Sequence, residues 1–253
     1  MMLDSWLSLP AGILIATMVS TVGIGGGILW MPFLLIILKV RPDTAVVTSL
    51  LIQTAGMGSG AVAFWRRQQI DIRLTGLLLA LAVPGIGIGA LLTCVLRPDH
   101  LELILGVLTL ATAIIFVSAN DRYGRVGRQR AELKAGRRYG WVVSIMAIAS
   151  GMLSISIGEW LVPLLRNKLS LRMGVAVATS VATIFGTCIL GAGSHLCLGG
   201  RADLASLFWA VPGVIIGGQI GPRIAGRIND RILKEIFVFL LTLIGIHLIY
   251  NSY

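Results

Sequence analysis

The chain has 253 residues, of which 56% are hydrophobic and 13% charged, and it carries a formal net charge of +10. A soluble domain carries roughly 25% charged residues, so this composition excludes an ordinary soluble protein. The net charge does not indicate nucleic-acid binding either. The basic residues lie in short connectors between apolar runs, which is the positive-inside pattern of membrane proteins.

Apolar runs of about 20 residues, the length that a membrane-spanning helix needs, recur along the whole chain. They do not alternate between apolar and polar residues, as the strands of a transmembrane barrel do. We therefore predict an all-α integral membrane protein, because lipid requires each backbone polar group to be paired within its own segment. The expected segments are 6–38, 43–65, 72–96, 101–117, 141–165, 173–198, 204–224 and 232–249.

The first segment contains the run GIGGG at positions 23–27, followed by Pro32, and this run predicts a break in the helix. Backbone N–H groups at the start of a half-helix carry partial positive charge and can bind an anion. Glycine lets a ligand approach the backbone closely. The pattern therefore indicates that Gly25, Gly26 and Gly27 bind substrate. Alternatively, these glycines permit close helix packing and nothing more.

The second segment carries Thr48 and Ser49 in the early turns of its helix. Their hydroxyl groups can donate hydrogen bonds to the oxygens of an anion, and we predict that both residues bind substrate. Alternatively, each hydroxyl bonds the backbone carbonyl four residues back, as serine and threonine often do in membrane helices. The third segment contains Gly85 and Gly89, a spacing that marks close contact between helices.

A basic linker, residues 119–139, follows the fourth segment, and the positive-inside rule predicts that it is cytoplasmic. Its basic residues are Arg122, Arg125, Arg128, Arg130, Lys134, Arg137 and Arg138.

The second half of the chain repeats the first half. The motif around Pro32 recurs around Pro163 at an offset of 163 − 32 = 131 residues. The same or a nearly equal offset relates Arg41 to Arg172, Thr48 to Thr179, Ser49 to Ser180, Asp71 to Asp203 and Gly85 to Gly213. An ordered set of matches indicates two copies of one membrane unit. We predict a first repeat over residues 1–118 and a second repeat over residues 140–253, joined by the linker.

A second helix break is expected at SISIG, positions 154–158, where the first half has its glycine run. By analogy with the first half, we predict that Ser156 and Gly158 in this break bind substrate. The same prediction holds for Thr179 and Ser180 in the following helix, with the same structural alternatives.

Glu159 follows the second break and replaces Ile28 of the first half. A carboxyl group at membrane depth is costly and is a functional candidate by default. Glu159 is therefore our candidate for proton coupling. Alternatively, it reaches the membrane interface or caps the start of its half-helix.

The basic connectors all fall on one side of the membrane if each broken segment enters and returns on the same side. Each half then has an odd number of full spans, so the two halves are inverted repeats, and both termini are predicted to lie outside. Whether the broken segments are re-entrant or discontinuous spans is left open. Inverted repeats with broken helices are a recurring design of secondary transporters.

Motifs for other chemistry are weak in this sequence. The three cysteines, Cys94, Cys188 and Cys197, form no CxxC pair, and no metal site is predicted. The glycine run resembles a phosphate loop only superficially, because no strand precedes it and no Lys-Ser/Thr pair follows. We predict no catalytic residue and no cofactor, and we expect that the protein is not an enzyme.

The chain resembles the sulfite exporter TauE/SafE family, also called the sulfonate uptake permease family. The resemblance rests on GIGGGILWMP at 23–32, AVVTSL at 45–50, IDI at 70–72, PGIGIG at 84–89 and their partners in the second half. It implies a transporter of small anions in the bacterial inner membrane, with sulfite and sulfonates among the substrates. The second break departs from the glycine cluster of the family pattern.

We therefore predict a multi-pass secondary transporter that moves a small anion, with protons as a possible coupling ion. Two alternatives stay open: a passive anion channel with the same fold, and a membrane assembly or sensor protein without a transported substrate. The sequence leaves the oligomeric state open.

Overall fold

The computed structural model describes residues 5–118, 127–224 and 230–251. Within these ranges the elements are all helices, and the extended pairing found there is one isolated bridge between Arg128 and Leu171. The prediction of an all-α protein is thus confirmed. Arg122, Arg125 and Arg227, which belong to the predicted basic connectors, lie outside the described residues.

The first half of the chain forms seven helical elements in order. They are η1 (Ser5–Leu7), α1 (Ser8–Val22), α2 (Gly27–Pro32), the π-helical turn η2 (Phe33–Ile37), α3 (Pro42–Arg66), α4 (Ile72–Val95) and α5 (Pro98–Ser118). The predicted break separates α1 from α2.

The second half begins with the short helix α6 (Leu133–Arg138) of the linker. It continues with α7 (Gly140–Leu153), α8 (Gly158–Asn167), α9 (Met173–Cys197), α10 (Leu204–Ile224) and α11 (Asp230–Asn251). The second predicted break separates α7 from α8.

Among the described residues, five helical segments are long and apolar enough to cross a membrane: Ser5–Val22, α3, α4, α9 and α10. The third helix expected to span in each half, α5 or α11, also forms, with 21 and 22 residues respectively. The apolar stretches found in these two helices, Leu103–Ile114 and Leu241–Tyr250, are shorter.

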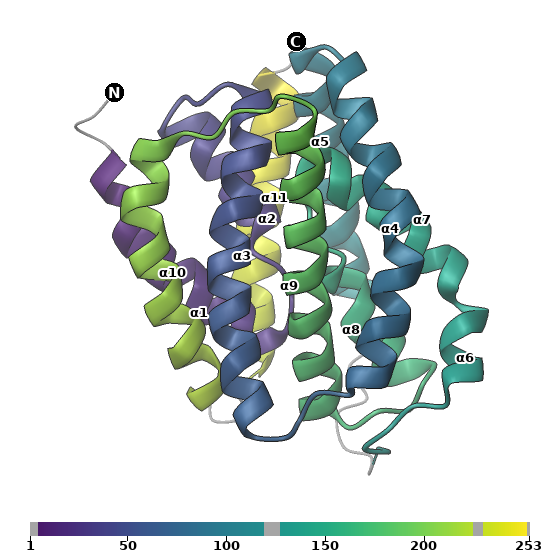
Figure 1. The fold of residues 1–253 in the computed structure, drawn as a ribbon. Coiled ribbons are helices and arrows are strands. Elements are labelled where there is room, and N and C mark those ends of the chain that lie inside the picture. Colours follow the sequence, from purple (N-terminus) through teal and green to yellow (C-terminus); the bar gives the residue numbers. More distant parts are fainter. Residues whose placement is uncertain (1–4, 119–126, 225–229, 252–253) are drawn as a thin grey trace.

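The two broken segments start from opposite ends of the molecule. In Figure 1 both termini lie at the upper end, α3 descends to meet α4 at the lower end, and α9 meets α10 at the upper end. The α1–α2 segment therefore begins and ends at the upper end of the molecule. The α7–α8 segment begins and ends at the lower end. The relation of the halves as inverted copies, and the side of the membrane on which each end lies, stay predictions from the sequence.

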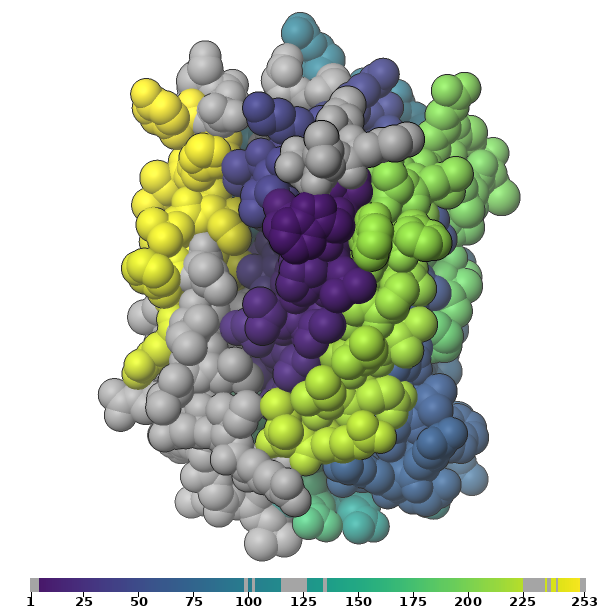
Figure 2. Space-filling view, turned by 90° about the vertical axis from the view of Figure 1, so that its left-hand side faces the viewer, coloured from purple at the N-terminus to yellow at the C-terminus, as the bar shows by residue number. Residues whose placement is uncertain are grey.

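The two halves interlock instead of lying side by side as separate bodies. Helix α1 packs along α10, α7 packs along α4, and α3 packs against α9 and α10. Figure 2 shows α1 in purple directly beside α10 in yellow-green, although the two are far apart in the sequence. The first helix of each broken segment, α1 or α7, thus packs mainly on a helix of the opposite half, whereas α8 packs on α9 of its own half.

Close helix contacts are made where the sequence places small residues. A Cβ atom on Gly217 of α10 would lie 2.9 Å from Cβ of Ala16 on α1, and a Cβ on Gly89 of α4 would lie 2.7 Å from the N of Met152 on α7. Both distances are too short for a real Cβ contact, so glycine is needed there. The interpretation of the glycine spacings as helix contacts is confirmed.

The described part of the linker is attached to the lower end of the molecule. The Arg128 N–H donates to Ser170 O at 2.8 Å, and the Arg172 N–H donates to Arg128 O at 3.0 Å. The Ala131 N–H donates to the carboxylate of Asp71 at 3.0 Å. The linker therefore joins the start of α4 to the connection between α8 and α9.

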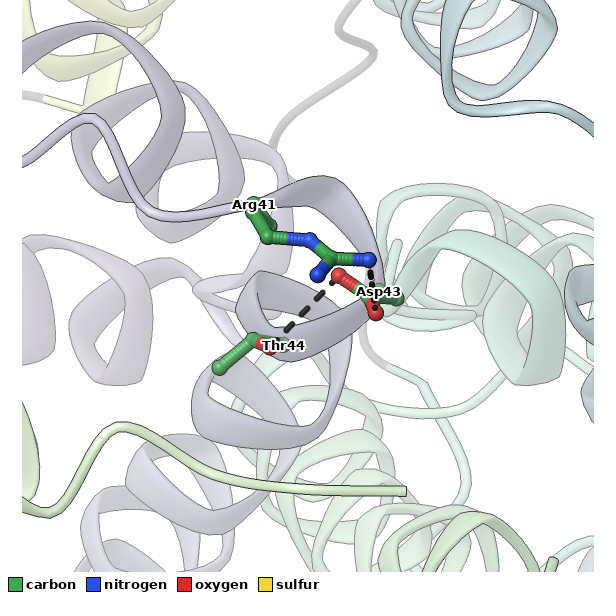
Figure 3. A network of polar contacts seen from close by, with 3 residues as sticks. All are labelled: Arg41, Asp43 and Thr44. Carbon is green, nitrogen blue, oxygen red and sulfur yellow. Dashed lines mark hydrogen bonds and ion pairs between the residues drawn. The ribbon is translucent and has the colours of Figure 1, made fainter. Parts of the chain in front are cut away.

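An ion pair marks the start of α3, as Figure 3 shows. Arg41 Nη2 lies 3.2 Å from Asp43 Oδ2, and the two side chains are 80% and 54% exposed. Thr44 Oγ1 lies 3.5 Å from the other carboxylate oxygen. Exposed pairs of this kind contribute roughly 0–1 kcal/mol, so this cluster is a surface feature of the helix start and no part of a site.

Candidate functional site

The first break begins where α1 ends. Gly23 adopts the left-handed conformation (φ 80°, ψ 19°), and its N–H donates to Val19 O. Glycine is favoured there because an L side chain is strained in this conformation, and a Cβ would also lie 2.8 Å from Cα of Val177. Residues 23–31 are all buried, so the interrupted backbone is enclosed by protein, as a break at membrane depth requires.

The second break has the same shape but a different residue at its turn. Ser154 is the residue of the second half that corresponds to Gly23 at the repeat offset. Its backbone is also in the left-handed conformation (φ 58°, ψ 12°), and its N–H donates to Ser150 O. A serine in this conformation is uncommon. The hydroxyl of Ser156 accepts a hydrogen bond of 3.0 Å from the N–H of Gly158, where α8 begins. Residues 150–159 are all buried.

The two breaks touch each other in the interior. A Cβ on Gly25 would overlap the side chain of Ser156, and a Cβ on Gly27 would overlap the carbonyl of Ser154. A Cβ on Gly158 would lie 3.0 Å from Gly23 O and 3.1 Å from Gly25 N. The structure therefore brings predicted residues from both halves into one buried cluster. Gly26 packs instead against Trp30 of its own segment.

Serines from α3 and α9 each reach the break of the opposite half. Ser154 Oγ lies 3.0 Å from Ser49 Oγ of α3, and Ser180 Oγ of α9 donates to Gly23 O at 2.7 Å. These contacts correspond to each other at the repeat offset. We refer to residues 23–27 and 154–159 with Ser49, Gln53 and Ser180 as the break centre.

Gln53 was not among the predicted site residues. Its position as a polar side chain inside an apolar run could have identified it as a candidate. Its Nε2 donates to Ser154 Oγ at 2.8 Å and to Ser154 O at 3.1 Å. Its Oε1 is buried without a hydrogen-bond partner among the described residues. The equivalent residue of the second half, Ile184, lies against Gly158 as Gln53 lies against Gly27.

The hydroxyls of Thr48 and Thr179 are engaged outside the break centre. Thr48 Oγ1 donates to Thr44 O at 2.7 Å and accepts from the N–H of Asp203 at 2.8 Å. In the corresponding contact, Thr179 Oγ1 accepts from the N–H of Asp71 at 3.1 Å. Each threonine thus joins its own half to an aspartate at the start of a helix in the other half. These contacts favour the structural alternative for both residues.

Replacing Thr48 by valine is expected to destabilise the fold by about 1 kcal/mol, because the partly buried N–H of Asp203 would lose its acceptor. Thermal unfolding of the purified protein measures this change. Thr54→Val is the matched control on the same helix, since the Thr54 hydroxyl donates to Leu50 O within α3. A Thr48→Val variant of unchanged stability that fails to bind a ligand would assign Thr48 to the binding site.

Glu159 is the most unusual side chain of the break centre. It is the second residue of α8, its exposed fraction is 0%, and neither carboxyl oxygen has a hydrogen-bond partner within the part of the chain that the structure describes. Glu159 therefore does not reach the interface, as one alternative for it supposed. A buried carboxyl without a partner is costly, which keeps it a functional candidate.

The chain combines several membrane-length helices with two interrupted segments whose breaks meet in a buried polar centre. This arrangement defines a multi-pass membrane protein of the transporter class. The chain belongs to the family described as "Sulfite exporter TauE/SafE", whose family model matches residues 8–248. The resemblance noted from the sequence motifs is confirmed over nearly the whole chain.

Several curated relatives match over most of their length. The chain is 25% identical to the "Probable membrane transporter protein YunE" of Bacillus subtilis, over 95% of this chain and 96% of the relative. It is 29% identical to YjnA of the same organism, over 90% and 94%, and 25% identical to YfcA of Escherichia coli K12, over 95% and 88%. Both of these are also named probable membrane transporter proteins. No solved structure matches the chain.

Proposed function

We propose that this protein is a secondary transporter that moves a small anion, such as sulfite, a sulfonate or a related sulfur-containing organic anion, across the bacterial inner membrane. The substrate binds at the break centre. The observation that carries the proposal is the meeting of the two helix breaks in the buried interior, each contacted by a serine of the opposite half. The name of the family supports the sulfur-oxyanion class.

The break centre can attract an anion without a cationic side chain. The first N–H groups of α8, a helix of ten residues, have no acceptor within the helix and carry partial positive charge. Serine hydroxyls and the Gln53 amide supply further donors that can be exchanged for substrate contacts. Because these donors carry no full positive charge, they bind the anion weakly enough for it to be released, which transport requires.

The contact between the breaks favours a transporter over an open passive channel. A substrate must separate the α1–α2 segment from the α7–α8 segment, because Gly25 and Gly27 lie directly against Ser156 and Ser154. One segment enters from the upper end and the other from the lower end (Figure 1). Separation at one end while the contact persists at the other gives alternating access around a fixed site.

A melting scan of the purified protein against anions tests this proposal. The panel contains sulfite, sulfate, thiosulfate, sulfoacetate, taurine, acetate and chloride. We expect a sulfur oxyanion to raise the melting temperature most, since a ligand at about 100 times its Kd stabilises by roughly 2.7 kcal/mol in a two-state transition. Ser49→Ala and Ser180→Ala are expected to reduce this ligand-induced shift.

Ser194→Ala serves as the matched control, because Ser194 lies on the same helix as Ser180 and donates to Leu190 O within that helix. Its ligand-induced shift should equal that of the unmodified protein. An absence of any shift across the panel would remove the anion class. A shift that survives both site substitutions would place the anion elsewhere in the protein.

A further inference from the structure

Glu159 lies beside the proposed anion site. Glu159 directly follows Gly158, and a Cβ on Gly158 would lie 3.1 Å from the backbone N of Gly25. The residue that carries the carboxyl group is therefore next in the chain to the contact between the two breaks. An anion held at the break centre therefore lies beside the residue that carries this buried carboxyl group.

The helices near Glu159 carry few titratable side chains. Helices α1, α2 and α7 contain no charged side chain, and α8 packs against α9. The titratable side chains of α9 are the buried thiol of Cys188, Cys197 at the helix end, and His195, which bonds Gly151 O on α7 at 2.7 Å. On α8 itself, Arg166 lies in the last turn, at the opposite end from Glu159. Among the described residues, neither carboxyl oxygen of Glu159 has a hydrogen-bond partner, so none of them compensates for a carboxylate at this position.

The break centre is asymmetric in its polar side chains. The first half has Ile28, fully buried, at the position of Glu159, and the second half has Ile184 at the position of Gln53. Each half thus supplies one polar side chain where the other supplies isoleucine. The break centre contains a single carboxyl group, so it can bind one proton there.

We propose that Glu159 binds the proton that moves together with the anion, so that the protein is a proton–anion symporter with one coupling proton. This inference rests on the proposed function. Two negative charges in one buried site of low dielectric repel each other strongly, so the anion binds while Glu159 is neutral. A neutral carboxyl can also donate its O–H to an oxygen of the substrate, whereas a carboxylate can only accept. Antiport would require the opposite order, with the proton leaving as the anion binds.

Anion affinity at mildly acidic and mildly alkaline pH tests the inference. The probes are thiosulfate and sulfoacetate, which keep their charge over this range, and calorimetry on the full-length protein gives the Kd. We expect affinity to fall by up to about tenfold per pH unit as pH rises, the limit for a single linked proton. In Glu159→Gln, which keeps the size and a neutral side chain, affinity should be the same at both pH values. Glu132→Gln, at an exposed linker ion pair, should keep the pH dependence of the unmodified protein.

Affinity that rises with pH would overturn symport in favour of antiport. A pH-dependent affinity that persists in Glu159→Gln would remove Glu159 from the proton site. Thiosulfate and sulfoacetate binding without any pH dependence in the unmodified protein would overturn the inference and leave the proposed anion transport standing. Failure of both probes to bind either protein, each shown by its melting curve to be folded, would instead count against the proposed function itself.

Discussion

Replacing Gly27 by alanine is expected to lower the melting temperature sharply and to abolish transport. A Cβ at this position would overlap the carbonyl oxygen of Ser154 and lie 2.7 Å from its carbonyl carbon and 2.9 Å from Gln53 Nε2. The neighbour that would have to move is backbone, held by the left-handed turn of the second break. Overpacking a buried site typically costs about 1–3 kcal/mol, and a rigid neighbour places this change at the upper end of that range.

Gly87→Ala is the matched control, because a Cβ on Gly87 of α4 meets no atom within 4 Å. Alanine is favoured over glycine inside a helix by about 1 kcal/mol, so this variant should be as stable as the unmodified protein or more stable. Melting curves together with anion uptake into proteoliposomes compare the two variants. Equal behaviour of Gly27→Ala and Gly87→Ala would show that the breaks do not touch as described.

Replacing Glu159 by isoleucine is expected to have opposite effects on stability and on function. The two side chains are similar in size, and isoleucine already occupies the corresponding position 28, where it is fully buried. Burying a polar group without a partner costs about 1–3 kcal/mol by protein mutational data, and a charged group costs more. The variant should therefore melt at a higher temperature, while pH-dependent transport is lost. Such a conflict between stability and activity is common at functional sites.

Ser8→Ala separates the general effect of removing a buried polar group from the specific effect at the break centre. Ser8 Oγ is also buried without a partner among the described residues, and it lies at the start of α1. This control should gain some stability and keep transport. A lower melting temperature for Glu159→Ile would mean that the carboxyl is stabilised by a group that this conformation does not bring to it.

The sequence predicted the helices and the first break well because their causes are local. Apolar length sets the spans, and the run at 23–27 interrupts the first segment where Gly23 takes its left-handed turn. The break at Ser154 has no comparable local cause, and it was found because the repeat offset pointed to it. That prediction is confirmed by the end of α7 at Leu153.

The partners of each residue could not be predicted in the same way. A threonine early in a membrane helix has the same local sequence whether it binds a ligand or accepts from a distant N–H, and the contact of Thr48 with Asp203 spans the two halves. The role of Gln53 depends likewise on Ser154, which lies far along the chain. Hydrophobic periodicity shows which face of a helix is apolar, but it does not show which other helix covers that face.

The contact between the two breaks also bears on how the protein is made. When the ribosome has synthesised the first half, the α1–α2 segment contains an interrupted backbone whose partners in the second half, Ser154, Ser156 and Ser180, do not yet exist. Such a backbone cannot be left facing lipid. We therefore expect that the nascent chain keeps this segment within the insertion machinery until most of the protein has been translated. A chain truncated before Gly140 should accordingly be a target for membrane proteases, although its helices α1 to α5 are complete.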